Sequence, residues 1–329
     1  MMDQETLPLV SFVVFSYNQE AYIEDAIRSA LAQDYPCLEI IISDDCSRDG
    51  TFELAKKLVQ EYSGKHTVEC RRNESNLGLI NHVNKFMSGL DSELVVVAAG
   101  DDISLPYRVS KLVDVYMSSG KPKLLSSKAF KIDEAGNLLE GYAPDRVIHI
   151  GDFNSILDSL NSIDGRVGLY LGATGAWSME LWRKYGPIQH THCWEDVVMG
   201  FRAALENSYK FVDEPLVKYR VNIGLSSKSA QSLKGKIALR KNKVNLKRDL
   251  ARQRYDDLAM SPKKYDPAVM GIVSKQVLIH SIRSAYYESP VSVWKYFKKN
   301  PDLTIIQGIS EGKYLLKASA QAGLDFAKA

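Results

Sequence analysis

Residues 93–106 read ELVVVAAGDDISLP, and this stretch decides the fold. Its valine-rich apolar run, Leu94–Ala99, is bounded by turn signals, which is typical of a strand buried on both faces of an α/β sheet. The run ends in Gly100, Asp101 and Asp102. Two adjacent carboxylates at the exit of a buried strand are costly unless a positive charge lies beside them.

The pair Asp101–Asp102 predicts a metal site. Open α/β sheets bind ligands at the C-terminal ends of their strands. Carboxylate oxygens suit Mg²⁺ or Mn²⁺, and these ions in turn hold substrate phosphates. We therefore expect the pair to anchor a divalent cation that carries a diphosphate. The alternative is a solvated acidic turn that caps a helix beginning near Leu105–Pro106.

The chain before this stretch alternates strands with helices. Strands are expected over residues 9–15, 38–43 and 68–71, and helices over residues 22–33, 52–62 and 79–87. This alternation predicts a parallel, doubly wound sheet. The second strand also ends in an acidic pair, Asp44–Asp45, so we expect a shared acidic site at one edge of the sheet. Because the first strand is not followed by GxGxxG or a P-loop, a metal rather than a glycine cradle would hold the phosphates.

Length, net charge and cysteine content limit the class of protein to which the chain can belong. A chain of 329 residues is long enough for two domains, at about 150 residues per domain. The net charge of +2 is close to neutral and does not indicate a nucleic-acid-binding protein. The four cysteines form no CxxC pair, which fits a reducing compartment. Neither a signal peptide nor an apolar stretch near the ~20 residues that span a bilayer is visible, so we expect a cytoplasmic location.

Residues 10–51, VSFVVFSYNQEAYIEDAIRSALAQDYPCLEIIISDDCSRDGT, closely resemble the opening of the family 2 glycosyltransferases, the inverting enzymes of the GT-A fold. Residues 98–109, AAGDDISLPYRV, resemble the metal motif of that family, often written DxD. The resemblance runs from about Pro8 to about Ser227. It implies an α/β fold of the GT-A nucleotide-diphospho-sugar transferase type, with a Rossmann-like mixed sheet, and a role in bacterial surface-polysaccharide biosynthesis.

The resemblance also implies roles for individual residues. The backbone around Phe15 and Ser16 and the side chain of Asp44 should contact the nucleobase, and a carboxylate there would favour UDP. Asp101 should face the ribose or the metal shell, and Asp102 should bind the metal directly. The residues that should close the loop beside the nucleotide are Asn76, Gly78 and Asn81.

A third acidic pair, Glu195–Asp196, opens an apolar helix expected over residues 197–205. Acids in the first turn of a helix are favoured by its dipole, and this is the structural alternative. By the resemblance, Asp196 is the base that deprotonates the acceptor hydroxyl, and Glu195 orients that base or the acceptor. An inverting transfer needs one such base set apart from the metal pair, since the metal stabilises the charge on the leaving diphosphate.

Two positions depart from the family pattern. Ala99 and Gly100 stand where many members carry a further aspartate, so the acidic site has fewer carboxylates than in those members. In the run Tyr219-Arg220-Val221-Asn222, an asparagine replaces a histidine that reaches the diphosphate or the metal, which leaves Arg220 as a candidate partner of the diphosphate. Small residues crowd the segment 171–178 and predict a close backbone approach, either to the donor sugar, as in the family, or to a packed strand.

The composition shifts near residue 229. We expect a catalytic domain over residues 1–228 and a helical extension over 229–329 that contacts the acceptor, a second subunit or a membrane. Its first helix is basic and could lie on an anionic membrane surface; the alternative is that it packs an apolar stripe on the catalytic domain or on a partner subunit of a homo-oligomer. We also expect strands over residues 211–213 and 216–221, helices over 153–160, 269–287 and 303–320, and a flap over 224–229.

Together these features predict a metal-dependent enzyme. It would transfer a sugar from a nucleotide-sugar donor, a UDP-sugar, to a hydroxyl of a glycan or lipid-linked acceptor, with Mn²⁺ or Mg²⁺ as cofactor, in the cytoplasm or at the inner face of the cell membrane. A rival, a sugar nucleotidyltransferase, should carry a basic glycine-rich loop after its first strand, and residues 15–20, FSYNQE, lack one. A second rival, a non-catalytic glycan-assembly module, is favoured by Ala99, Gly100 and Asn222.

Overall fold

The computed structural model describes residues 7–143, 170–221, 223, 232–261 and 267–326. The chain forms two compact units. The first contains residues 1–159, 166–188 and 195–226, and the second contains 160–165, 189–194 and 227–329. The predicted helix at 153–160, the predicted flap at 224–229 and Asn222 lie outside the described residues.

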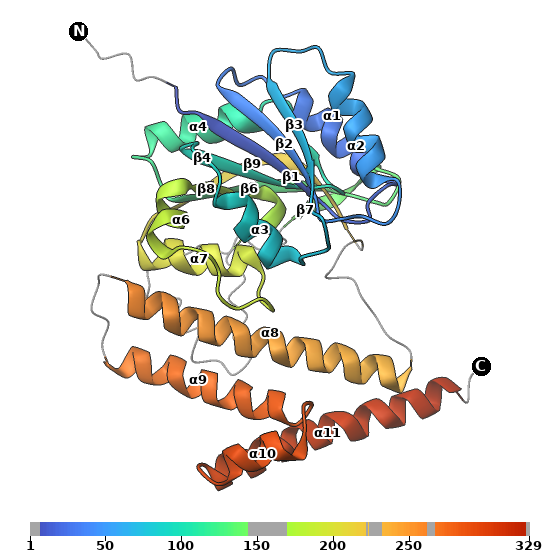
Figure 1. Ribbon diagram of the computed structural model, residues 1–329, viewed down its shortest axis with the longest axis vertical. Helices are drawn as coiled ribbons and strands as arrows, with labels where there is room; N and C mark the ends of the chain where they lie inside the picture. The colour runs from blue at the N-terminus through green and yellow to red at the C-terminus, as the bar shows by residue number, and fades with distance from the viewer. Residues whose placement is uncertain (1–6, 144–169, 222, 224–231, 262–266, 327–329) are drawn as a thin grey trace. The chain divides into compact units, whose positions relative to one another are not determined.

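The first unit is built on a mixed sheet, which has nine strands among the described residues (Figure 1). Its strands follow the order β3-β2-β1-β4-β8-β6-β9-β5, and β7 pairs with β6. The strands are β1 (Val10–Ser16), β2 (Leu38–Asp44), β3 (Thr67–Arg72), β4 (Leu94–Ala99), β5 (Ile103–Ser104), β6 (Leu124–Ile132), β7 (Leu138–Ala143), β8 (Ala176–Ser178) and β9 (Tyr209–Arg220). The expected parallel arrangement holds for β3, β2, β1 and β4, whereas β8 runs antiparallel to β4.

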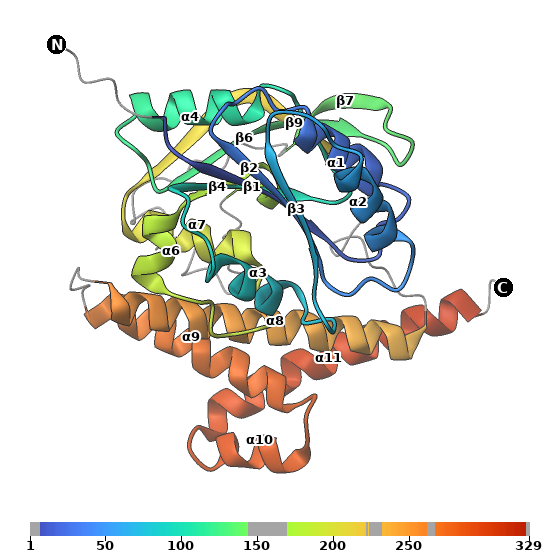
Figure 2. The same ribbon diagram turned by 45° about the horizontal axis from the view of Figure 1, so that its top comes forward.

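Helices cover both faces of this sheet. On one face, α1, α2 and α4 pack against alternate residues of the central strands, such as Phe12 and Val14, as the two-residue period of a strand requires. Figures 1 and 2 place α3, α6 and α7 on the other face. The helical elements are α1 (Ile23–Leu31), α2 (Thr51–Gln60), α3 (Leu79–Met87), α4 (Arg108–Ser118), the short 3₁₀ turn η1 (Gly172–Thr174), α6 (Met179–Tyr185) and α7 (Glu195–Leu205).

Strand β9 is longer than the sequence indicated. Strands at residues 211–213 and 216–221 were expected separately, and the structure joins them into Tyr209–Arg220. Pro215, which cannot donate to a sheet ladder, lies where the register between β6 and β9 shifts. The strand therefore continues past the proline and carries Arg220 to the end of the sheet where β4 also ends, because β5 pairs with β9 there.

The second unit is helical, as expected for the C-terminal region. Its helices are α8 (Leu233–Met260), α9 (Pro267–Ala285), α10 (Pro290–Phe297) and α11 (Pro301–Phe326), of which α10 had not been expected (Figure 2). Residues 189–194 also belong to this unit, since the backbone N–H of Gln189 donates to Gln253 at 2.8 Å. Across the described residues, no helix combines the length and the apolar character that crossing a membrane requires.

Candidate active site

The ends of β1, β2 and β4 meet at one edge of the sheet. Ser16 is paired with Asp44 across β1 and β2, and Phe15 is paired with Ala99 across β1 and β4. The backbone N–H of Gly100 donates to the Phe15 carbonyl at 2.9 Å. The predicted acidic residues at the end of β2 and after β4 therefore lie on either side of the end of β1, as the parallel register requires.

Asp102 is buried at this edge and is 5% exposed. Its Oδ1 accepts a hydrogen bond from the backbone N–H of Arg220 at 2.8 Å. Burial raises the pKa of the Asp102 carboxyl well above its usual range, the negative charge of Asp101 raises it further, and the nearby cations of Arg108 and Arg220 only partly oppose this. Burial also raises the pKa of Asp101.

The acidic pair fits a divalent cation. Burial raises the pKa of both carboxyls even though Arg108 and Arg220 lie nearby, so further positive charge would stabilise their ionised forms. Among the residues that the structure describes, Asp101 and Asp102 are not part of a cluster of three or more acidic, histidine or cysteine ligands. Mg²⁺ and Mn²⁺ commonly use one or two carboxylates and complete their shell with water and substrate phosphate. The donor set is therefore sufficient for an ion that binds together with a diphosphate.

The side chain of Arg220, the predicted partner of the diphosphate, is bound to the chain itself. The residue is 2% exposed. Its guanidinium donates to the carbonyls of Asp101, Asp133 and Glu134 at 2.7–3.0 Å, and it lies 3.4 Å from a carboxylate oxygen of Asp25. These bonds hold the turn that carries the acidic pair, and the pairing of Arg220 with the diphosphate stays a prediction.

Arg108 belongs to the same edge and was not identified from the sequence. It is fully buried, and it donates to Ser104 Oγ at 2.9 Å and to the Val97 carbonyl at 2.8 Å. Burial lowers the pKa of its guanidinium to about 9, although the charge of Asp102 opposes this. The signal that could have found it is an arginine at the start of a helix, six residues after an acidic pair that needs a cation.

The two acids that follow β2 organise the neighbouring loops. Asp44 is fully buried, and its carboxylate accepts from the backbone N–H and the hydroxyl of Ser47 and lies 3.5 Å from Arg72 Nε. Asp45 accepts from the backbone N–H groups of Leu77 and Gly78 at 2.9 Å. The contact of Asp44 with a nucleobase stays a prediction, and it would require the Ser47 loop to move.

The predicted loop residues lie beside these acids. Asn76 donates to the carbonyl of Asp45 at 3.2 Å, and the amide of Asn81 donates to the Leu77 carbonyl at 3.1 Å. Gly78 has φ = 76°, a left-handed conformation that favours glycine, and it precedes the first residue of α3. The structure therefore brings Asn76, Gly78 and Asn81 to the same sheet edge, and their nucleotide contacts stay a prediction.

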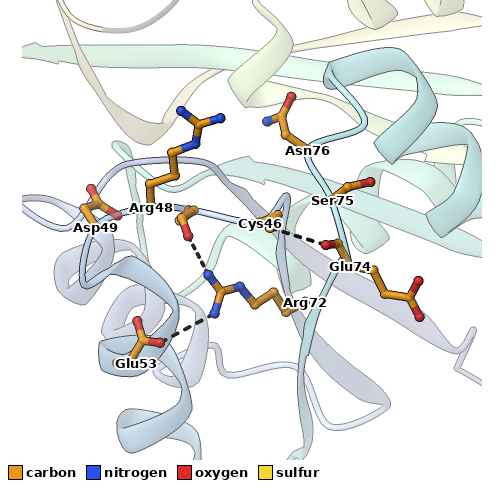
Figure 3. Close-up of a pocket in the computed structure, with 9 residues that line it drawn as sticks. Cys46, Arg48, Asp49, Glu53, Arg72, Glu74, Ser75 and Asn76 are labelled. Atoms are coloured by element: carbon orange, nitrogen blue, oxygen red, sulfur yellow. Dashed lines mark hydrogen bonds and ion pairs between the residues drawn. The ribbon is translucent and has the colours of Figure 1, made fainter.

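An open pocket of about 700 Å³ lies between the loops that follow β2 and β3 (Figure 3). Arg72 crosses its floor, where it donates to the Ser47 carbonyl at 2.5 Å and lies 3.5 Å from Glu53. The lining residues are Cys46, Ser47, Arg48, Asp49, Glu53, Arg72, Glu74, Ser75 and Asn76. Of these, Asn76 alone had been predicted as a site residue, because the pocket forms only when the two loops meet.

The third acidic pair lies at the start of α7, and both of its side chains are half-buried. Asp196 Oδ1 accepts from the backbone N–H of Val197 at 2.7 Å. The backbone of η1 lies against the pair, since a Cβ added to Gly172 would be 3.2 Å from Asp196 Oδ2 and 3.4 Å from Glu195 Oε1. This contact of Gly172 with the acidic pair had not been predicted. The predicted packing of the 171–178 segment on a strand holds for β8, which pairs with β4 and β6.

The two carboxyls of this pair have different pKa values, and burial raises both. It raises the pKa of Asp196 to about 6. It raises the pKa of Glu195 to about 8, and the negative charge of Asp196 adds to that shift. At neutral pH Asp196 is therefore ionised while Glu195 holds its proton, which is the state that a base with a neutral neighbour requires.

The 3₁₀ turn η1 connects this pair to the edge of the sheet. The Gly175 carbonyl, at the end of η1, accepts from the backbone N–H of Val97 at 3.0 Å and from Arg108 at 3.4 Å. Arg108 also interacts electrostatically with Asp102. A continuous set of contacts within the first unit thus links Asp102 to Asp196, while Asp44 lies two strands from β4 on the same edge.

Comparisons with known proteins agree with this fold. The model of glycosyl transferase family 2 matches residues 11–121. The Bacillus subtilis protein named "Putative glycosyltransferase EpsE" is 30% identical over 129 residues, 39% of this chain and 46% of that protein. The "Putative teichuronic acid biosynthesis glycosyltransferase TuaG" of the same organism is 36% identical over 91 residues, 26% of this chain and 36% of that protein. The chain therefore spans less than half of the length of either relative.

Two solved structures share the fold. Residues 1–349 of S. aureus TarS, in complex with UDP, align over 96% of this chain and 88% of theirs, with a TM-score of 0.55 and 16% identity. The mannosyltransferase PcManGT from Pyrobaculum calidifontis, in complex with GDP-Man and Mn²⁺, aligns over 97% of this chain and 87% of its own, with a TM-score of 0.50 and 15% identity. The match to glycosyl transferase family 2 thus covers residues 11–121, and the two solved structures show that the chain shares a GT-A fold.

Proposed function

We propose that the chain is a cytoplasmic, metal-dependent, inverting glycosyltransferase of bacterial cell-surface polysaccharide biosynthesis. It moves the sugar of a UDP-sugar to a hydroxyl of a glycan or lipid-linked saccharide. The observation that supports the proposal is that η1 lies against Glu195–Asp196 at Gly172 and is bonded at Gly175 to β4, the strand that precedes Asp101–Asp102. The UDP bound in the TarS complex supports a UDP-sugar as the donor. The name of TuaG, which mentions teichuronic acid biosynthesis, supports a role in cell-surface polysaccharide synthesis.

Asp101 and Asp102 would hold Mn²⁺ or Mg²⁺, which when bound neutralises negative charge on the leaving diphosphate. Arg220 keeps these carboxylates in place through its backbone N–H and its bond to the Asp101 carbonyl. Arg108 supplies the buried positive charge behind them. The acidic pair can therefore keep its position whether or not a nucleotide is bound.

Asp196 removes the proton of the acceptor hydroxyl. The acceptor oxygen then forms a bond to the anomeric carbon on the face opposite the diphosphate. The bond from that carbon to the diphosphate oxygen breaks, its electron pair leaves with the diphosphate, and the configuration inverts. The proton stays on the Asp196 carboxyl, while the neutral Glu195 adds no second negative charge to the site at neutral pH.

The test measures UDP affinity of the whole chain by calorimetry, with Mn²⁺ and with EDTA. We expect EDTA to weaken UDP binding at least about tenfold, since the cation bridges carboxylates and phosphates. Asp102→Asn should lose the same factor in the presence of Mn²⁺, whereas the exposed Asp114→Asn on α4 should bind as the wild type does. Equal affinity under all conditions would exclude a metal-supported donor site.

A second measurement asks for the reaction itself. The protein is incubated with Mn²⁺ and single nucleotide sugars, and release of free UDP is followed. Slow donor hydrolysis by the wild type would exclude a non-catalytic assembly module. Release that is the same for Asp102→Asn and the wild type would show that the acidic pair takes no part.

A further inference from the structure

Helix α11 has three polar side chains turned inward. Thr304, Gln307 and Glu311 are buried, with exposed fractions of 1%, 6% and 1%. Aliphatic side chains take the outer positions, and their exposed fractions are Ile305 47%, Ile306 58%, Ile309 55% and Leu316 74%. This is the reverse of the usual surface helix, which buries its apolar stripe.

Hydrogen bonds fix this orientation. Glu311 accepts from both Nε and Nη2 of Arg240 on α8, at 2.8 and 2.6 Å, and from the Tyr287 hydroxyl at 2.7 Å. Gln307 accepts from Arg283 Nε on α9 at 2.7 Å. Rotating α11 to bury its isoleucines would break these buried charge-assisted bonds, so the aliphatic stripe stays outside.

Helix α10 contacts α11 (Figure 2), and its residues are exposed or half-buried. None of its residues is buried. Val291 is 79% exposed, and Trp294 is 56% exposed and stacks on Phe297 at a centroid distance of 5.3 Å. Large exposed apolar surfaces of this kind mark contacts with another molecule.

The charge on the two helices identifies that molecule. Between residues 290 and 320, whose side chains the structure describes, five lysines are exposed and Asp302 is the one exposed acid. The lysines are Lys295, Lys298, Lys299, Lys313 and Lys317. In an isologous contact with a second copy, each subunit would present the same lysines to its partner. An anionic lipid surface offers the opposite charge, and tryptophan with flanking lysines is the usual composition at a lipid headgroup layer.

We propose that α10 and α11 bind the surface of an anionic lipid bilayer. The apolar side chains enter the headgroup boundary, and the five lysines contact lipid phosphates, in the manner of a helix that lies in the interface plane. The proposed membrane contact therefore lies on α10 and α11. The sequence had suggested α8, the first basic helix of this region, as a candidate for it. On α8, Arg240 and Arg248 are engaged in ion pairs with Glu311, Asp249 and Glu288.

The test is co-sedimentation of the full chain with vesicles of phosphatidylcholine alone and of phosphatidylcholine with phosphatidylglycerol. Binding should require the anionic lipid. Lys295→Gln with Lys298→Gln should weaken it about 25-fold, since each lysine near a charged surface is worth about 1 kcal/mol. The matched control, Lys241→Gln with Lys243→Gln on exposed positions of α8, should bind as the wild type does.

Tryptophan fluorescence gives an independent readout. Anionic vesicles should shift the emission of the wild type to the blue, and Trp294→Phe should abolish the shift. Equal loss from the α8 control pair, or binding that ignores lipid charge, would overturn the proposal. So would sedimentation equilibrium that finds a homo-oligomer which Ile306→Ser dissociates, together with no vesicle binding, because the surface would then belong to a second copy. None of these measurements depends on transferase activity, so their outcome is separate from that of the proposed function.

Discussion

At the scale of single residues, the start of α7 holds the two carboxyls to which the proposed mechanism assigns the proton transfer. Asp196 and Glu195 are neighbours in sequence, yet burial and mutual repulsion leave them in different protonation states at neutral pH. A base with a pKa near 6 is ionised at neutral pH and still accepts a proton well. The pair is thus suited to one proton transfer rather than to holding a second metal.

Asp196→Asn should lower kcat by about 10²–10⁴, the usual contribution of a general base, and leave UDP affinity unchanged. The wild-type rate should rise with pH through about 6, as the Asp196 carboxyl ionises. Steady-state kinetics across pH and calorimetry with UDP check this. Asp114→Asn serves as control, and a near-normal kcat in the Asp196 variant would remove Asp196 from the mechanism.

Glu195→Gln should change how stability depends on pH. The Glu195 carboxyl has a pKa near 8 in the folded chain and an ordinary value of 4.5 when unfolded. Its contribution to stability is therefore full below about 4.5 and is lost as the pH rises through about 8. From about pH 5 to pH 9 the variant should gain at least ~1.4 kcal/mol relative to the wild type, the worth of one pKa unit. Urea unfolding at both pH values checks this, and a difference that does not vary with pH would contradict it.

At the scale of elements, η1 places the α7 acids. Gly172 has room for no Cβ without movement of Asp196, which an added carbon would approach to 3.2–3.3 Å. The same turn ends at the Gly175 carbonyl, which is bonded to β4. A side chain added at Gly172 would therefore push against the Asp196 carboxylate, while the bond from Gly175 holds the end of the turn on β4.

Gly172→Ala should reduce kcat at least about tenfold with little change in UDP affinity, because a small misplacement of a catalytic group costs much of its effect. Gly89→Ala is the matched control, since a Cβ there meets nothing within 4 Å. Kinetics and UDP calorimetry on both variants separate the two effects. If both variants kept the wild-type kcat, η1 would have no positioning role.

At the scale of the whole molecule, the second unit depends on a buried acid. Burial alone would raise the pKa of Glu311, but hydrogen bonds from Arg240 and Tyr287 outweigh it and lower the pKa. A lowered pKa means that this stabilisation is present above about 4.5 and is lost as the pH falls through the folded value. The helices of this unit are thus joined by polar contacts as well as by their apolar core.

Glu311→Gln should lower the free energy of unfolding by about 3–5 kcal/mol, since it leaves the buried Arg240 cation without its counter-charge. Glu288→Gln is the control, because Glu288 is exposed where it pairs with Arg248, and it should cost less than about 1 kcal/mol. Urea unfolding at neutral pH checks both. Equal small losses would show that the buried pair adds no stability.

Much of the first unit could be predicted from the sequence alone. The helix at 79–87 and the strand at 94–99 have the predicted bounds, because periodicity and turn residues are local signals. The sequence could not show that β9 continues past Pro215. The register shift that accommodates the proline depends on the partner strand, β6. The hydrogen-bond partners of Arg220 could not be predicted for a similar reason, since they come from α1, the turn after β4 and the turn at Asp133–Glu134.

The sequence by itself determined that acids follow β2 and β4 and that strands and helices alternate, because parallel strands bring their ends to one edge whatever lies around them. Only the tertiary structure decided what surrounds those acids. The bond from Arg220 to Asp102 spans 118 residues, and the backbone of Gly172 lies against Asp196. The outward isoleucines of α11 follow from polar contacts with α8 and α9. Such neighbours depend on long-range packing, which local patterns do not encode.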